Sequence, residues 1–258
     1  MKILVVGGGG REHAIIRALK KSPDCGDIWC APGNGGIGYD ATCKNISATD
    51  VDAMVAFAKA EAFDYVVVAQ DDPLALGMVD ALAKVGIPAF GPDAAAARIE
   101  ASKVFSKDLM KKYGIPTAGY ETFDDPAKVM DYIRSKGKYP VVIKADGLAL
   151  GKGVLICQNE QEAADGVKEI MLDKKFGASG NHVVVEEFLT GPEVSVLSFT
   201  DGKVVKPMVS SMDHKRANDH DTGLNTGGMG TVAPNPYYTP AIAAECMEKI
   251  FLPTIKAM

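Results

Sequence analysis

The sequence lacks the features that mark several large classes of protein. Its 258 residues contain no apolar run of about 18 residues, so no membrane-spanning helix is expected. The first apolar run, residues 3–6, is too short for a signal peptide and no cleavage site follows it. Internal repeats and low-complexity segments are also missing, which excludes a repeat protein. We therefore expect an ordinary folded chain with no membrane among its partners.

Cysteine pairs and a strong excess of one charge are absent as well. The five cysteines form no C-x-x-C pair and are odd in number, so they are expected to be the reduced cysteines of a cytoplasmic protein. A net charge of −5 argues against a broad nucleic-acid-binding surface. With 47% apolar and 24% charged residues, the composition is that of a globular protein with one large domain or about two to three small ones.

Strands and helices alternate over the first hundred or so residues. Strands are expected at 3–6, 65–69 and 88–90, and helices from residue 11, over 52–59, and from Pro73 to about Gly86. This order predicts a parallel sheet with helices on both faces. Ligands of such sheets bind beyond the carboxyl ends of the strands, where two glycine loops and the acids Asp71 and Asp72 lie. We therefore expect one cleft at that edge.

The first glycine loop raises the alternative of a nicotinamide-dependent oxidoreductase. Gly7 and Gly9 fit the first two places of G-x-G-x-x-G, but Glu12 holds the third, and a shift by one residue puts His13 there. The acid that would hold a ribose about 20 residues later is replaced by a second glycine loop, residues 32–36. A loop for a small phosphorylated substrate at a helix N-terminus therefore fits better.

A glycine-rich hairpin at residues 141–154, V-V-I-K-A-D-G-L-A-L-G-K-G-V, is the strongest single signal. Two short apolar runs flank a small-residue loop, and Lys144 ends the first run. Glycine N–H groups and lysines suit phosphate oxygens. No Ser or Thr follows Gly151 and Lys152, so the loop is not the nucleotide-binding P-loop. We expect phosphate contact here, with a solvated surface hairpin as the alternative.

The second half of the chain continues with helices and strands of mixed order. Helices are expected over 102–113, from Asp124 or Asp125 with Pro126, and from a cap at Asn159 to about 172. Taken alone, each lysine of the first of these helices, Lys103 and Lys107, is most simply a solvated charge. The strand at 182–188 ends in two adjacent acids, and the residues after it indicate a hinge whose backbone can meet a ligand edge.

The last part of the sequence predicts a hairpin across Asp201 and Gly202, then a long stretch without periodicity, then a helix from Pro240. The aperiodic stretch, residues 213–230, is expected to be either disordered or functional. Its acids and histidines raise the alternative of a metal cluster, but they lack a fixed ligand spacing.

Together these strings resemble the ATP-grasp fold and, within it, the phosphoribosylamine–glycine ligases, also called glycinamide ribonucleotide synthetases. The resemblance covers the whole chain in order. It is carried by G-G-R-E-H-A (9–14), A-P-G-N (31–34), F-G-P (90–92), V-I-K-A-D-G-L-A-L-G-K-G-V (142–154), V-E-E-F-L (185–189), D-H-K-R (213–216) and D-T-G-L-N-T-G-G-M-G (221–230). The first and last strings separate this ligase from other ATP-grasp enzymes.

The resemblance implies an α/β and α+β fold. A substrate-side parallel-sheet domain (pre-ATP-grasp), residues 1–101, would precede an ATP-grasp fold whose two lobes clamp ATP. Residues 102–190 would form the small lobe and residues 191–258 the start of the large lobe. Family members continue past Met258 and carry there the ligands of Mg²⁺ or Mn²⁺, so the fold is expected to be incomplete and no metal ligand is assigned here. A monomer or weak self-association is expected.

The implied activity is an ATP-dependent ligation in de novo purine biosynthesis. Glycine's carboxylate attacks the γ-phosphate of ATP to give glycyl phosphate and ADP. The amine of 5-phosphoribosylamine then displaces phosphate and forms glycinamide ribonucleotide. No covalent enzyme nucleophile is needed. A nucleotide-binding fragment without turnover is the non-enzyme alternative.

The resemblance also implies roles for particular residues. The expected catalytic residues are Lys144, Asp213 and Lys215. Those expected at ATP are Lys103, Lys144, Gly147, Gly151, Lys152 and Gly153 around the phosphates, Glu186, Glu187, Phe188 and Leu189 at adenine, and Glu193 at the ribose. Those expected at the other substrates are Gly9, Gly10, Arg11, Gly33, Asn34, Asp71, Asn225, Thr226, Gly227 and Gly228. Asp71 stands where the family usually has glutamate, so this acid is one methylene shorter.

Overall fold

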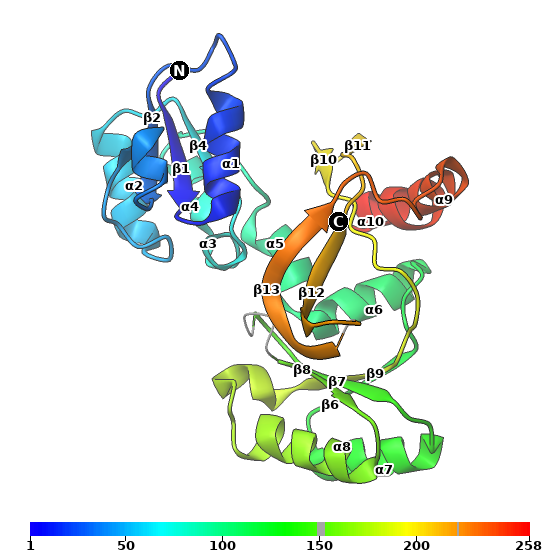
Figure 1. Cartoon of the computed structure of the whole chain (residues 1–258). Helices are drawn as coiled ribbons and strands as arrows, with labels where there is room; N and C mark the ends of the chain where they lie inside the picture. The colour runs from blue at the N-terminus through cyan, green and yellow to red at the C-terminus, as the bar shows by residue number, and fades with distance from the viewer. Residues whose placement is uncertain (149–152, 221) are drawn as a thin grey trace. The chain divides into compact units, whose positions relative to one another are not determined.

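A computed structural model describes residues 1–148, 153–220 and 222–258 (Figure 1). The chain divides into two compact units. Unit 1 comprises Met1–Ser106, Ala145–Gly153 and Phe176–Asn181, and unit 2 comprises Lys107–Lys144, Val154–Lys175 and His182–Met258. In the part of the chain that is described, no helix has the length and apolar character needed to cross a membrane.

Unit 1 is built on a five-stranded sheet in the order β3-β2-β1-β4-β5. Its strands are β1 (Ile3–Gly7), β2 (Ile28–Pro32), β3 (Thr42–Cys43), β4 (Tyr65–Val68) and β5 (Ala89–Phe90). Every neighbouring pair is parallel. The central strand β1 is buried along its whole length, as expected for a parallel sheet covered on both faces. The parallel sheet predicted from the sequence is therefore confirmed.

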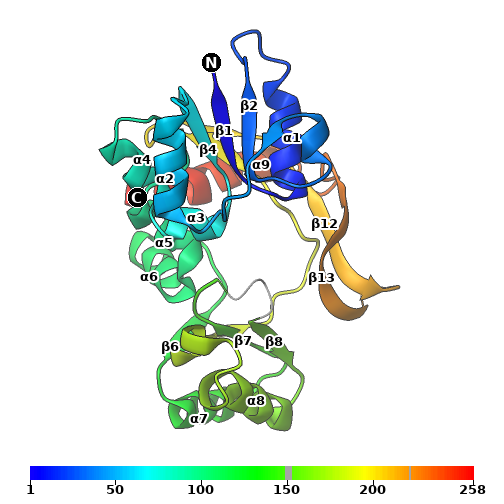
Figure 2. The same ribbon diagram turned by 90° about the vertical axis from the view of Figure 1, so that its left-hand side faces the viewer.

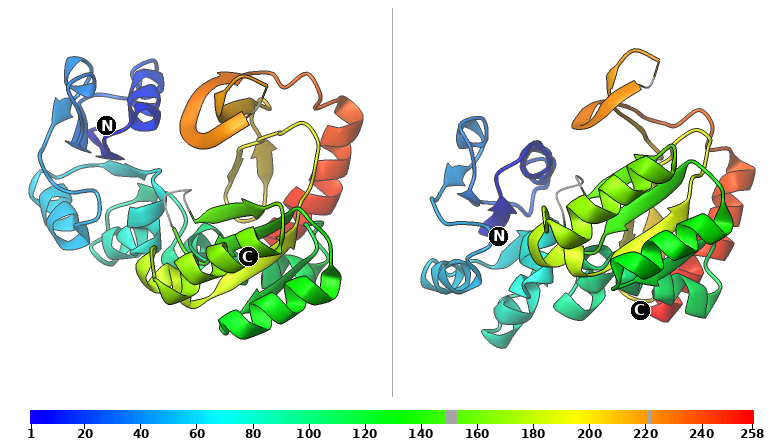
Figure 3. Two further views of the ribbon diagram at one scale, coloured as in Figure 1. Left: turned by 60° about the horizontal axis from the view of Figure 1, so that its bottom comes forward. Right: turned by 90° about the horizontal axis from the view of Figure 1, so that it is seen from below.

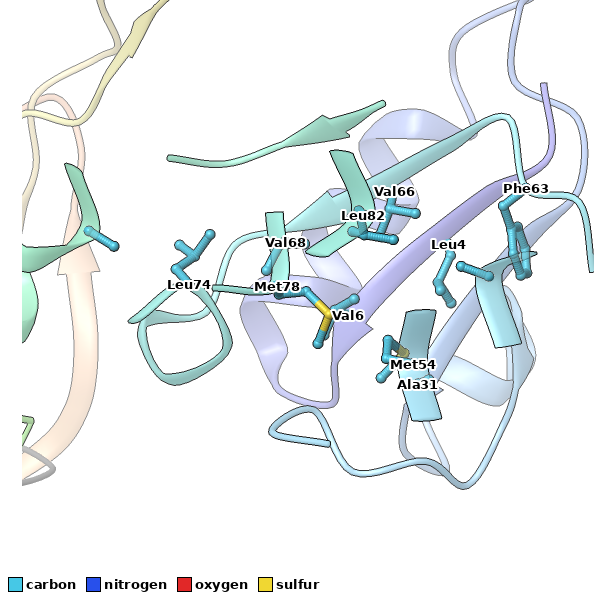
Figure 4. Close-up of a cluster of buried hydrophobic side chains, with 12 residues drawn as sticks. Leu4, Val6, Ala31, Met54, Phe63, Val66, Val68, Leu74, Met78 and Leu82 are labelled. Atoms are coloured by element: carbon cyan, nitrogen blue, oxygen red, sulfur yellow. The ribbon is translucent and has the colours of Figure 1, made fainter. Parts of the chain in front are cut away.

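Helices cover both faces of this sheet, and alternate residues of β1 enter two separate cores. Leu4 and Val6 pack with Met54 of α2 (Val51–Ala60) and with Leu82 of α4 (Met78–Lys84), as Figure 4 shows. Ile3 and Val5 instead join the cluster that contains Ile16 of α1 (Gly10–Leu19). Figure 2 accordingly shows α1 and α2 on opposite sides of the strands. Because the strands are all parallel, the loops that follow them lie at one edge of the sheet.

The single helix predicted from Pro73 to Gly86 is wrong in detail. The structure has α3 (Asp71–Ala75) followed by α4, with Gly77 between them. Gly77 has φ +82, a left-handed conformation that interrupts a right-handed helix and that glycine adopts without strain. Two further helices follow, α5 (Ala94–Ala101) and α6 (Lys103–Tyr113), of which α6 passes from unit 1 into unit 2 at Lys107. A short 3-10 helix, Ile37–Tyr39, follows β2, and another, Gly177–Asn181, also belongs to this unit.

Unit 2 contains a four-stranded sheet in the order β6-β9-β7-β8. Its strands are β6 (Tyr120–Phe123), β7 (Val141–Ala145), β8 (Val154–Cys157) and β9 (Val183–Glu187). Two helices, α7 (Pro126–Lys136) and α8 (Glu160–Val167), lie side by side on one face (Figure 3), and α8 continues as a π-helix, Lys168–Leu172. The predicted cap at Asn159 is confirmed, because it accepts from Glu162 N–H, and of the two predicted candidates for the other cap it is Asp125 that accepts from Ala127 N–H.

The remainder of unit 2 contains two hairpins and a helical run. The predicted hairpin across Asp201 and Gly202 is confirmed, although its strands β10 (Ser198–Thr200) and β11 (Val205–Pro207) are short. The aperiodic stretch forms a second hairpin of β12 (Met212–Asn218) and β13 (Thr222–Val232). The residue pattern there shows no strand signal because glycines in β13 carry no side chains that alternate. Helical turns follow as α9 (Pro240–Cys246), a π-helix Met247–Phe251 and α10 (Leu252–Ala257).

Candidate functional site

Lys144 and Glu186 form an ion pair on the four-stranded sheet of unit 2. Lys144 lies near the end of β7, and its Nζ is 2.8 Å from Oε2 of Glu186 on the neighbouring strand β9. The side chain of Glu186 is 6% exposed, whereas that of Lys144 is 28% exposed. Buried valines and Ile143 precede both residues and fix the backbone of the two strands. The pair therefore presents an ammonium group to solvent from a rigid base.

A second lysine, Lys107 of α6, holds the same carboxylate. Its Nζ lies 3.3 Å from Oε1 of Glu186 and also donates to Thr117 Oγ1 at 2.6 Å. The side chain is 10% exposed, so the prediction that Lys107 is a solvated charge is wrong. It comes four residues after Lys103, and this spacing puts two side chains on one helix face. The spacing shows a shared helix face but not burial, which depends on the distant Glu186.

The two adjacent glutamates at the end of β9 have different partners. Glu187 Oε1 accepts from the backbone N–H of Gly119 at 2.7 Å, while Glu186 pairs with the lysines. They therefore do not act together as an acid–base pair. Phe188 and Leu189, which follow the strand, are exposed. Their apolar side chains are therefore not part of the core of unit 2.

Three predicted residues meet in unit 2 around the ammonium group of Lys215. Its Nζ lies 2.5 Å from Glu193 Oε1 and 3.6 Å from Asp213 Oδ2. The hydrogen bond to Glu193, reinforced by the charges of Glu193 and Asp213, raises the pKa of Lys215 against a smaller opposing effect of burial. Asn235 Nδ2 donates to the carbonyl oxygen of Glu193 at 2.8 Å and so fixes its backbone. The result is a cation held between two carboxylates.

Hairpin pairing places part of the glycine-rich segment beside this cation. Thr226 Oγ1 donates to the carbonyl of Lys215 at 2.8 Å and accepts from Gly228 N–H at 3.1 Å. A Cβ on Gly228 would lie 3.0 Å from Asp213 Oδ1, and the φ of Gly228 is +100, so a larger residue is disfavoured. Gly227 lies between them in β13. Asn225 was also predicted here, but its side chain is not among the parts that the structure describes.

In unit 1, Lys103 lies at the base of the glycine hairpin. Its Nζ donates to the carbonyl oxygen of Gly147 at 2.7 Å. The neighbouring Asp146 accepts from Ser102 Oγ at 3.1 Å and from Val104 N–H at 3.2 Å, which ties the hairpin to the start of α6. Gly153 closes the hairpin by accepting from Ala145 N–H at 2.8 Å. The predicted Gly151 and Lys152 lie outside the described residues.

The loops after β1, β2 and β4 meet at one edge of the parallel sheet, as predicted. Gly33 N–H donates to the carbonyl of Gly7 at 3.0 Å, and Asn34 Nδ2 donates to that of Gly8 at 2.8 Å. Arg11 and Asp71 are exposed at this end of the sheet, in the first turns of α1 and α3. The structure thus brings the predicted substrate-side residues of unit 1 to a common edge.

Glu12 is a buried residue of this edge whose role sequence reasoning missed. It is 2% exposed, and its Oε2 accepts from Gly9 N–H at 2.6 Å and from Gln70 Nε2 at 3.4 Å. A Cβ on Gly7 would lie 2.7 Å from Glu12 Cγ. A carboxylate therefore already accepts at the N-terminus of α1, where a dinucleotide would place its diphosphate. This geometry opposes the dinucleotide interpretation beyond the mismatch in spacing.

A cavity of about 650 Å³ lies along the side of α1, and of the predicted residues only Gly10 lines it. Asp40 there lies 2.7 Å from Lys20 Nζ and 2.8 Å from His13 Nε2. Hydrogen bonds from Lys20 and His13 lower the pKa of Asp40 to about 2. His13 is therefore a helix-surface histidine held by an acid.

The described residues contain no group of three or more His, Cys, Asp or Glu side chains placed to hold a metal ion. Asp221, one member of the alternative metal cluster, lies outside the described residues.

All five cysteines are free. Burial raises the pKa of Cys30 to about 12 and that of Cys157 to about 11, so these two stay protonated thiols at neutral pH.

Comparison with known proteins gives consistent results over the whole chain. The family model described as "Phosphoribosylglycinamide synthetase, N domain" matches residues 1–100, and that described as "Phosphoribosylglycinamide synthetase, ATP-grasp (A) domain" matches residues 101–258. A phosphoribosylamine–glycine ligase from Haemophilus influenzae is 45% identical over 260 residues, which cover 100% of this chain and 60% of that protein.

Solved structures agree in fold. The phosphoribosylamine–glycine ligase from Thermotoga maritima superposes with a TM-score of 0.82 at 32% identity, covering 100% of this chain and 61% of that one. The biotin carboxylase domain of Hydrogenobacter thermophilus 2-oxoglutarate carboxylase has a TM-score of 0.75 over 99% of this chain and 57% of its own, but at 17% identity it shows the fold alone. The chain thus spans about 60% of the length of its curated relatives. It belongs to the phosphoribosylglycinamide synthetase family and has the ATP-grasp fold.

Proposed function

We propose that this chain binds ATP as part of a phosphoribosylamine–glycine ligase. The observation that carries the proposal is the arrangement in unit 2, where Lys144 offers an ammonium group from a rigid strand and the neighbouring strand runs out into exposed Phe188 and Leu189. A fixed cation suits phosphate oxygens, and an exposed backbone segment with apolar side chains suits adenine. Family membership supports this assignment.

The roles of the other nucleotide-binding residues follow the same chemistry. Lys103 and the hairpin containing Gly147 and Gly153 would bind phosphates through an ammonium group and backbone N–H groups. The backbone from Glu186 to Leu189 would meet adenine, and Glu193 would accept from the ribose hydroxyls. Asp213 and Lys215 would act on the transferring γ-phosphoryl group, where Lys215 would stabilise the developing negative charge.

The substrates follow from the family to which the chain belongs. Glycine would be converted to glycyl phosphate, and 5-phosphoribosylamine would displace the phosphate to give glycinamide ribonucleotide, ADP and phosphate in purine biosynthesis. The loops that contain Gly9 and Asn34, together with Arg11 and Asp71, would bind the phosphorylated sugar. Thr226 and Gly228, beside Asp213, would face the acceptor substrates.

The proposed reaction uses a divalent metal ion, but we assign no residue of this chain as its ligand. In ATP-dependent phosphoryl transfer, Mg²⁺ or Mn²⁺ would neutralise the negative charge of the phosphates. The described residues supply no group suited to hold such an ion.

We also propose the cytoplasm as the location of the protein, since the five free cysteines suit a reducing compartment.

Titration calorimetry with ATP and with NADH tests the proposal. We expect ATP to bind and NADH not to bind, because Glu12 accepts at the N-terminus of α1 where the dinucleotide's diphosphate would lie. Binding of NADH without ATP would favour the oxidoreductase alternative and overturn the proposed function. A phosphate-release assay with glycine and 5-phosphoribosylamine would then distinguish a ligase from a nucleotide-binding fragment without turnover.

A further inference from the structure

Lys107 is a buried cation whose side chain makes several defined contacts in unit 2. Besides Glu186 and Thr117, its Nζ lies 3.4 Å from the carbonyl oxygen of Ala118 and 5.3 Å from the ring centre of Tyr120. A lysine is seldom so fully buried unless it is paired. Protein groups therefore hold the ammonium group of Lys107 on several sides.

Lys107, Glu186 and Lys144 form a cluster of three charges, and the second lysine decides its net charge. Lys107 and Lys144 contribute two positive charges and Glu186 one negative charge, which leaves a net charge of +1. Without Lys107, the carboxylate of Glu186 would neutralise Lys144, and the cluster would carry no net charge. Of the two lysines, Lys144 is the more exposed, so the excess charge is presented through Lys144.

We infer that Lys107 is a positioning residue that sets how strongly Lys144 attracts nucleotide phosphate, by sharing the Glu186 carboxylate. This inference rests on the proposed function, since it concerns the phosphate end of the proposed ATP site. Lys107 holds Oε1 of Glu186 while Lys144 holds Oε2, so Lys144 is only partly engaged by the acid. The remaining N–H groups of Lys144 and the net positive charge are then available to a phosphate.

The matched experiment compares the affinities of ATP and adenosine, because adenosine lacks the phosphates. Lys107→Met replaces the lysine with an unbranched neutral side chain. At a separation of several ångströms in partly exposed surroundings, loss of one charge should lower the ATP-to-adenosine affinity ratio about five- to thirtyfold. Adenosine affinity should stay within about twofold. Lys112→Met removes an exposed charge from the same helix and should leave the ratio unchanged.

Two further variants separate charge control from a merely structural role. In Lys107→Met/Glu186→Gln the cluster again carries +1, so the ratio should return to within about threefold of the wild type. Lys107→Arg keeps the charge and should preserve the ratio even if the larger side chain lowers the melting temperature. If Lys107→Met does not fold, Glu186→Gln and the double variant still decide, because the ratio should rise in the first and fall back in the second.

The outcomes distinguish this inference from the proposed function. If the wild type binds ATP but Lys107→Met has the same ratio as Lys112→Met, or the double variant stays as low as Lys107→Met, Lys107 is structural and the inference is overturned. An equal loss of ATP and adenosine affinity overturns it in the same way. If the wild type binds no adenine nucleotide, the proposed function fails and the inference fails with it.

Discussion

Nζ of Lys144 lies 2.8 Å from Oε2 of Glu186, and the same carboxylate is held through its other oxygen by Lys107. This relationship means that Glu186 keeps a partner when Lys144 is removed. A variant at Lys144 can therefore report on ligand binding without leaving a buried, unpaired carboxylate, which would strongly destabilise the fold.

We predict that Lys144→Ala weakens ATP binding about 10- to 150-fold, because a hydrogen bond to a charged group contributes roughly 1.5–3 kcal/mol. Lys152→Ala, at a lysine outside the described residues, is expected to have a smaller effect because the sequence places Lys152 in the loop of the hairpin and Lys144 on its strand. Calorimetric titration measures both affinities, and thermal melting checks that each variant is folded. Equal, small losses would show that the ammonium of Lys144 does not bind phosphate.

We predict that Glu12→Ala lowers the free energy of unfolding by about 1–2 kcal/mol, the upper part of the range for loss of a helix cap. The reason is that Gly9 N–H and Gln70 Nε2 would lose their acceptor in a buried place. Urea denaturation followed by circular dichroism measures the change. The matched control is Asp50→Ala, since Asp50 caps α2 from an exposed position through Ala53 N–H, and its loss should cost less. A larger loss at Asp50 would contradict the importance of burial.

The sequence predicted those elements whose signal lies in a short stretch of neighbouring residues. Short apolar runs that alternate with helices, glycine turns and capping residues are local signals, so the parallel sheet, the hairpin across Asp201 and the caps at Asn159 and at one of the two candidates Asp124 and Asp125 were predicted correctly. The hairpin formed by β12 and β13 was missed because glycines in β13 leave no alternation of side chains. Strand pairing there is carried by the backbone, which the residue pattern does not reveal.

For the candidate site, the sequence predicted individual residues but not the contacts between them. Lys144 and Glu186 were predicted as separate ligands of one nucleotide, whereas their contact with each other depends on β7 and β9 being neighbours, a long-range relationship. Burial of Lys107 and Glu12 was missed for a similar reason. A charged residue in a helix is exposed by default. Burial of Lys107 depends on the distant Glu186, and Glu12 is held both by the local N–H of Gly9 and by the distant Gln70.

We predict a loss of stability in acid that involves Asp40. The pKa of Asp40 is lowered from 3.8 to about 2 by hydrogen bonds from Lys20 and His13. A carboxyl group whose pKa is lower in the folded state stabilises the fold above its unfolded pKa, and this contribution is lost as pH falls through the folded pKa. The unfolding free energy of the wild type should therefore fall from about pH 4 to pH 2, and Asp40→Asn should show a smaller fall. Urea denaturation across this range measures the difference. An equal fall in both proteins would mean that Asp40 does not contribute.

The final prediction concerns exposed apolar side chains in the last part of unit 2. Leu197 is 70% exposed, Val209 62% and Phe199 53%, all within the segment that contains β10 and β11. Exposed apolar patches of this kind mark surfaces that associate with other proteins or with further copies of the chain. We therefore predict that the 258-residue chain associates with itself at micromolar to millimolar concentrations.

Sedimentation velocity over a range of concentrations measures this association. Leu197→Glu with Val209→Glu should shift the chain toward monomer, because two charges would have to be buried in the contact. Leu76→Glu is the matched control, since Leu76 is also exposed, at 58%, but lies in unit 1 between α3 and α4. If the wild type sediments as a monomer throughout, or if Leu76→Glu disperses it as well as the double variant does, this segment of unit 2 is not the associating surface.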